Sequence, residues 1–141
     1  MFDKSEGERL RLWHQFRQTL EHSKDPIQDT IDFYSSAPLT SISMDPYDSE
    51  SWMNPWELLN YNMYCDFGKI LGIGYTISLT DRFSSKPKMI HISTNKKVAE
   101  TKYLLYIGDT VVGYEYDTWV NQNKIDSEWI AETAVPLPSY Q

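Results

Sequence analysis

The sequence predicts an α+β fold, with helices in the first half of the chain and an antiparallel sheet after them. Two observations carry this prediction. Before residue 68, apolar residues recur every three to four positions, which is the spacing of an amphipathic helix. After residue 68, β-branched and aromatic residues dominate short runs between turn signals, which is typical of strands. At 141 residues, the chain is expected to form a single domain, residues 1–141.

The first half is predicted to hold three helices. In residues 8–23, one apolar stripe is made by Leu10, Trp13, Phe16 and Leu20. Residues 26–34 follow Asp25, which is a preferred N-cap, and begin with a proline at the first helical position. The third helix, residues 55–65, follows Asn54, with a glutamate three residues after the asparagine in the spacing of a capping box.

A long loop, residues 38–53, separates the second and third helices, and connections of this length usually serve a function or pack by their own side chains. Its Tyr47 and Trp52, together with Trp56 and Tyr140, are the candidate partner-binding residues, because Tyr and Trp dominate protein-binding hot spots. We also expect both tryptophans to be largely buried and to pin the loop against the third helix, because an exposed indole forfeits its packing.

The second half is predicted to form an antiparallel meander. The predicted strands are residues 70–79, 89–94, 103–107 and 111–116. In the first of them, Gly72 and Gly74 are interpreted as a bulge or a close backbone approach. Gly108 and Asp109 form the tight turn of a hairpin. From about residue 131, the chain is expected to be an extended C-terminal tail.

Charge is distributed in blocks. Residues 25–68 carry eight acids and no Lys or Arg, residues 69–102 carry seven bases and two acids, and residues 103–141 carry six acids and one base. These blocks predict either complementarity between layers of the fold or a charge-steered contact with a partner. The net charge of -7 argues against direct nucleic-acid binding. No apolar run approaches the ~20 residues of a spanning helix, so no membrane contact is expected.

One set of residues could carry chemistry. Cys65, His91 and either Asp109 or Asp117 are a possible nucleophile, base and orienting acid, because a thiol needs a nearby imidazole to become a thiolate. The alternative is a buried structural cysteine, and on that interpretation no catalytic residue is expected. A single cysteine cannot form an internal disulfide, which indicates a reducing site of synthesis.

The order helix, cysteine, histidine-bearing strand and aspartate resembles the transglutaminase-like branch of the papain-type cysteine enzymes over residues 55–120. The chain departs from that pattern in three ways. Cys65 is predicted near a helix end, where the dipole disfavours a thiolate. Glycines are predicted to cut short the helical turn that follows it. His91 is followed by Ile92 and lacks an aromatic neighbour.

Metal and cofactor sites are not expected. The histidines, His14, His22 and His91, are scattered, and no pair of His or Cys residues has zinc-ligand spacing. Residues 45–50 offer three carboxylates but lack the frame of a calcium loop. The glycines of residues 72–74 open no predicted helix, so they do not form a phosphate-binding loop.

A second resemblance spans most of the chain. Its motifs are Asp45–Asp48, Trp52–Leu58, Tyr64–Gly68, Leu71–Thr76, Leu104–Asp109 and Val112–Tyr114. They look like a small protein of tailed marine phages with contractile tails, the cyanophage type. The resemblance implies a phage origin, a place in or near the virion and synthesis in the bacterial host cytoplasm. Together with the tyrosines and tryptophans, the charge blocks and the long loop, it leads us to expect protein–protein contacts at the neck, tail or baseplate, with other phage structural proteins or copies of the chain itself as partners. The expected function is therefore a non-enzymatic structural or assembly role. The alternatives are the cysteine enzyme and a small intracellular phage regulator.

Overall fold

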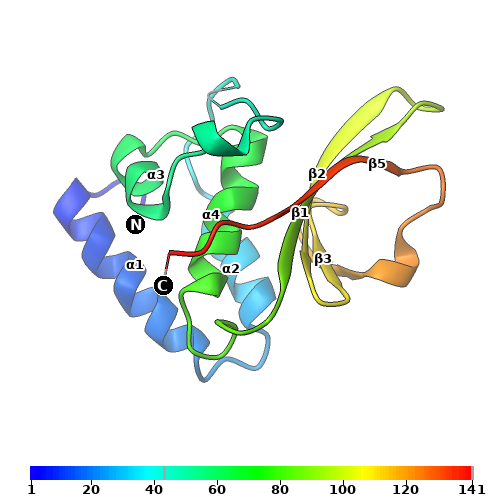
Figure 1. Cartoon of the computed structure of the whole chain (residues 1–141). Helices are drawn as coiled ribbons and strands as arrows, with labels where there is room; N and C mark the ends of the chain where they lie inside the picture. The colour runs from blue at the N-terminus through cyan, green and yellow to red at the C-terminus, as the bar shows by residue number, and fades with distance from the viewer. Residues whose placement is uncertain (43, 141) are drawn as a thin grey trace.

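The structure, a computed structural model, describes residues 1–42 and 44–140. A layer of helices covers one face of an antiparallel sheet, which confirms the predicted α+β class (Figure 1). In the described residues the helices are α1 (Glu6–Leu20), α2 (Pro26–Tyr34), α3 (Pro55–Tyr61) and α4 (Asp66–Ser78). The strands are β1 (Lys88–Asn95), β2 (Glu100–Ile107), β3 (Thr110–Val112), β4 (Val120–Asn121) and β5 (Ile130–Pro136). Short 3-10 turns occupy Ser49–Ser51 and Gln122–Lys124.

Side-chain caps explain where the first three helices begin. Ser5 caps α1, and Asp25 caps α2 by accepting from the Gln28 backbone N–H. Asn54 and Glu57 form the predicted capping box of α3. The bounds of α2 are those predicted, whereas α3 ends at residue 61 and not at 65. It stops there because Asn62 adopts the left-handed conformation, with φ 53°, and ends the helix.

The predicted strand over residues 70–79 is wrong, because these residues lie in helix α4. Ten of its thirteen residues are buried, so the helix is apolar nearly all round and shows little amphipathic periodicity. Its glycines allow close helix packing. A Cβ on Gly72 would lie 2.7 Å from the Tyr34 ring, and one on Gly74 would lie 3.1 Å from Leu137. The bulge interpretation of these glycines is therefore also wrong.

The sheet has the strand order β4-β3-β2-β1-β5, and all its pairings are antiparallel. Strands β1, β2 and β3 correspond to the predicted strands 89–94, 103–107 and 111–116, with the tight turn at Gly108, although β3 ends at residue 112. Strand β4 extends this meander beyond the predicted strands. The sheet begins at residue 88, not near 70. The segment from about residue 131, expected to be an extended C-terminal tail, is extended, but it belongs to the sheet, because it forms most of β5, which pairs along β1 (Figure 1). Beyond β5, the Leu137 N–H donates to the Lys88 carbonyl, and its side chain is buried against α4.

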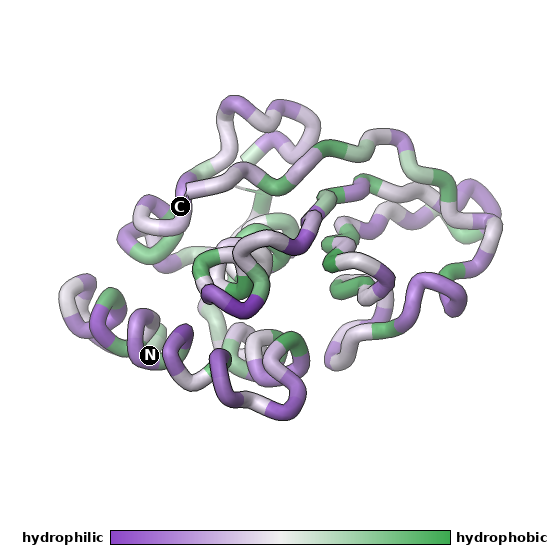
Figure 2. The backbone as a smooth tube through the Cα atoms, turned by 60° about the horizontal axis from the view of Figure 1, so that its bottom comes forward, coloured by the Kyte–Doolittle hydropathy of each residue, from purple (hydrophilic) through white to green (hydrophobic). Residues whose placement is uncertain are grey.

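A buried hydrogen-bond network joins three helices inside the main core. The Trp13 indole N–H of α1 donates to the Thr76 Oγ1 atom of α4 at 2.9 Å, and the Tyr34 hydroxyl of α2 lies 3.1 Å from the same oxygen. The Thr76 hydroxyl donates to the Gly72 carbonyl at 2.7 Å, so Tyr34 is the donor in its contact. Burial raises the pKa of Tyr34 to about 12, which keeps that proton in place. The α1 tube, beside the N label in Figure 2, alternates between hydrophilic and hydrophobic colour, as expected for a helix with one buried face.

Candidate functional site

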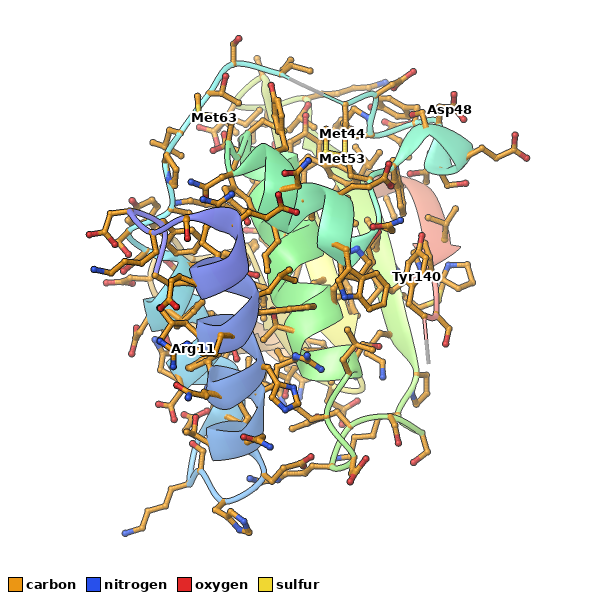
Figure 3. The ribbon with its side chains drawn as sticks, turned by 90° about the vertical axis from the view of Figure 1, so that its left-hand side faces the viewer. Arg11, Met44, Asp48, Met53, Met63 and Tyr140 are labelled. Atoms are coloured by element: carbon orange, nitrogen blue, oxygen red, sulfur yellow. The ribbon has the colours of Figure 1, made fainter. Side chains whose placement is uncertain are left out.

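Trp52 belongs to the core. It is 6% exposed, its indole N–H donates to the Asp45 carbonyl at 3.1 Å, and its ring centroid lies 5.0 Å from that of Phe67. The prediction that Trp52 is buried and anchors the long loop is thus confirmed. The element it packs against is α4, however, and not the third helix. Nearby, the Met53 N–H lies 3.3 Å from the Met44 sulfur, and these two side chains lie beside each other in Figure 3.

The prediction that Trp56 is buried is wrong, because its side chain is 44% exposed. Helix α3 has only two turns, and these bury Leu58 and Leu59, which leaves the second helical position facing outward. The Trp56 ring instead meets Tyr140 edge-on at 6.1 Å, and Tyr140 in turn lies 5.5 Å from Tyr75. Tyr140 is labelled in Figure 3, on the face that bears the helices.

Of the four predicted partner-binding residues, the structure therefore brings only Trp56 and Tyr140 together. We call these two residues the aromatic patch. Tyr47 is 59% exposed on the long loop. Trp52 is held in the core and is not available to a partner.

Cys65 occupies the N-cap of α4, not the end of a preceding helix. Its sulfur accepts from the Gly68 backbone N–H at 3.3 Å, and the residue is 4% exposed. The glycines after it lie inside α4 and do not interrupt it. Two of the three departures from the cysteine-enzyme pattern are thus corrected: the glycines do not shorten the helix, and Cys65 stands at a helix start, which favours negative charge. Cys65 also lines a pocket of about 280 Å³ together with Phe67 and Tyr103.

His91 lies on the other side of the sheet from Cys65. Its neighbour Ile90 belongs to the core that contains the cysteine, so the alternation of β1 turns His91 toward the other face. There its ring lies 4.2 Å from that of Tyr106, and burial lowers its pKa. The structure therefore does not bring the predicted thiol and base together.

The two candidate acids also lie apart from the thiol. Asp109 sits in the turn between β2 and β3, where its carboxylate accepts from the Gln122 side chain at 3.0 Å. Asp117 lies beyond β3, and its carbonyl accepts from Gln28 at 2.7 Å. Within residues 1–42 and 44–140, no three His, Cys, Asp or Glu side chains could together hold a metal ion. In the same residues no helix is both long and apolar enough to cross a membrane.

Sequence reasoning missed a larger pocket of about 450 Å³ between α2, α4 and strands β2 and β3. We call it the groove. Its floor is apolar and is built by Ile31, Ile70, Ile73 and Val112. Its charged lining consists of Asp32, Asp66, Lys69, Lys102, Glu115 and Asp117. The three charge blocks of the sequence therefore meet at this one place, and they were the signal that could have located it.

One wall of the groove is formed by residues 113–117, which together with residues 118 and 119 we call the flap. The flap leaves the sheet at Gly113, which has φ +104° and whose Cβ would lie 2.3 Å from the Tyr103 carbonyl oxygen, so only glycine fits there. Two contacts tie the flap to the start of α2. The Gln28 side chain donates to the Asp117 carbonyl, and the Trp119 indole N–H donates to the Asp25 carboxylate at 3.1 Å.

Exposed apolar side chains stand at the lip of the groove. Tyr116 of the flap is 89% exposed, and Leu39 is exposed on the opposite side. A groove of this size, with an apolar floor and a few polar groups, has the dimensions of a binding site.

Comparison of the chain with family models, with characterised proteins and with solved structures finds no match.

Proposed function

We propose that this chain is a non-enzymatic protein of a phage particle that acts at the neck, tail or baseplate. It works through contacts with other phage structural proteins or with copies of itself. It is made in the bacterial host cytoplasm and carried in the virion. The phage assignment rests on the sequence resemblance over the motifs between Asp45 and Tyr114. The contact role rests on one structural observation, the groove with its tethered flap.

The groove supports a macromolecular partner because apolar and aromatic groups remain exposed around it. Tyr116 and Leu39 at its lip would lose contact with water when a protein surface covers the opening. The aromatic patch, Trp56 and Tyr140, supplies a second exposed surface of the residue types that dominate protein-binding hot spots.

A cysteine enzyme is the second candidate, and one observation favours it. Cys65 stands at the start of α4 and lines a pocket, as a nucleophile would. This candidate also needs a base for the thiol. His91 does not supply one from the outer face of the sheet, so the contact role is the better supported proposal.

Quantitative mass spectrometry of purified particles tests the proposal. We expect the chain at a fixed copy number relative to the known neck, tail and baseplate proteins of the same particle, unchanged by a further gradient purification. The major capsid protein provides the internal standard. A chain that is abundant in infected cells but lost from purified particles would contradict the proposal and support a small intracellular regulator.

A further inference from the structure

We infer that the groove binds a short segment of a partner protein that combines apolar side chains with lysine or arginine. This inference rests on the proposed contact role and names the chemistry of the partner. It is carried by the floor of the groove, by the balance of its unpaired charges and by the way the flap is held.

The floor selects apolar side chains. Ile70 and Ile73 of α4 and Val112 of β3 come from the two layers of the fold and line the same pocket. Their packing in the main core holds them in place, so this surface is formed before a partner arrives. Ile70, Ile73 and Val112 are only 7%, 5% and 3% exposed. A partner that covers the groove therefore removes apolar surface from water mainly at the lip, at Leu39 and Tyr116, without first ordering the floor.

One of the two positive charges in the groove, that of Lys102, already makes contacts within the chain. The Lys102 ammonium donates to the Tyr114 carbonyl at 2.6 Å and lies over the rings of Tyr114 and Trp129, at 4.7 and 5.1 Å. Lys69 contributes the other positive charge of the lining. An acidic partner segment would therefore have to compete with these contacts in order to pair with Lys102.

The negative charges of the groove are more numerous than the positive ones. Four carboxylates line the groove. Glu115 lies 3.9 Å from Lys124, and Asp32 accepts from Gln28 at 3.0 Å. In the described part of the chain, no hydrogen bond or ion pair involves the carboxylates of Asp66 or Asp117. The lining therefore presents an excess of negative charge, which complements lysine or arginine on the partner.

The flap gives the groove a fixed second wall. Its two tethers, Gln28 to the Asp117 carbonyl and Trp119 to Asp25, join it to α2, the helix that forms the adjoining wall. The Gln28 side chain donates both to the Asp32 carboxylate, at 3.0 Å, and to the Asp117 carbonyl, at 2.7 Å, so the two acids line adjoining walls of the groove. A basic side chain of the partner would meet negative charge from both residues at this edge of the groove.

Peptide selection tests the inference. A yeast-displayed library of random dodecapeptides is selected on the folded wild-type protein, and the enriched peptides are made with a fluorescein label. Their dissociation constants are measured by fluorescence polarisation with three proteins. These are the wild type, the double variant Asp32→Lys/Asp117→Lys, and a charge-matched control, Glu50→Lys/Glu100→Lys. The control changes two exposed acids that do not line the groove.

We expect the enriched peptides to combine lysine or arginine with apolar residues. They should bind the wild type and the control equally, and the groove variant more weakly by a factor of about 10 or more.

Asp32 lies in the last turn of α2, where a positive charge suits the helix dipole, so the variant is expected to fold. Thermal unfolding of all three proteins checks this. If the double variant unfolds, Tyr116→Ala provides the second test, since this side chain is exposed and its loss should weaken the same peptides.

Three results would overturn the inference. The selection yields no enriched peptide, the enriched peptides are acidic or uncharged, or they bind the charge-reversed variant as tightly as the wild type. These failures can be told apart from failure of the proposed function. A chain present at fixed copy number in particles, without groove-dependent peptide binding, would leave the particle role standing and remove only this partner chemistry.

Discussion

Replacement of Trp13 by alanine is expected to lower the free energy of unfolding by about 3 to 5 kcal/mol. The indole is 1% exposed and fills the space between α1 and α4. Its removal leaves a cavity and also takes away the N–H that the Thr76 hydroxyl oxygen accepts. The loss is measured by urea unfolding, followed by far-ultraviolet circular dichroism.

Trp56→Ala is the matched control for this prediction. It removes the same side chain from a position that is 44% exposed, so the expected loss is about 1 kcal/mol or less. Equal losses in the two variants would contradict the helical packing described above, because one indole would then be no more deeply packed than the other.

Gly113→Ala is expected to lower the free energy of unfolding by about 2 to 5 kcal/mol. The positive φ of +104° disfavours any side chain, and the new Cβ would lie 2.3 Å from the Tyr103 carbonyl oxygen. That neighbour is backbone of β2 and has little freedom to move. Thermal and urea unfolding measure the effect.

Gly7→Ala is the control for the glycine substitution. Gly7 lies in α1, and a Cβ added there would have nothing within 4 Å, so alanine should stabilise the protein by about 0.4 to 1 kcal/mol. An alanine at position 113 that is tolerated as well as one at position 7 would show that the flap does not leave the sheet in the way described.

The local start signals of the helices could be predicted from the sequence, because caps act within three or four residues. Asp25 and Asn54 placed the starts of α2 and α3. The turn at Gly108 and Asp109 placed the hairpin between β2 and β3 for the same reason. In each case the physical cause lies inside the segment itself.

Helix α4 could not be predicted from local pattern. A segment buried on nearly all sides carries no amphipathic period, so its isoleucines suit a buried strand and a buried helix equally. Tertiary contacts decide between the strand and the helix. Gly72 lets the Tyr34 ring approach, and that contact involves a residue 38 positions earlier in the chain. Misassigning this one element also misplaced Cys65 at the end of a helix when it stands at the start of one.

The geometry of the candidate sites also depends on contacts between residues that lie far apart in the sequence. Whether His91 faces the cysteine or the far side is decided by a single residue of strand register. The groove combines residues from α2, α4, β2 and the flap, which no local motif connects. Only the alternation of charge blocks marked it in advance. That signal predicted either complementarity between layers of the fold or a contact with a partner, and it placed neither on the fold.

The central claim, that a partner covers the groove in the particle, is tested most directly by acetylation footprinting of lysines. Lys69 lines the groove, whereas Lys97 is exposed in the turn between β1 and β2. The rate of acetylation by acetic anhydride is measured for both lysines by mass spectrometry, in the free protein and in intact purified particles. We expect Lys69 to react several-fold more slowly in the particle than in the free protein, with Lys97 unchanged. Equal acetylation of Lys69 in the two states, or protection of Lys97 alone, would contradict the claim.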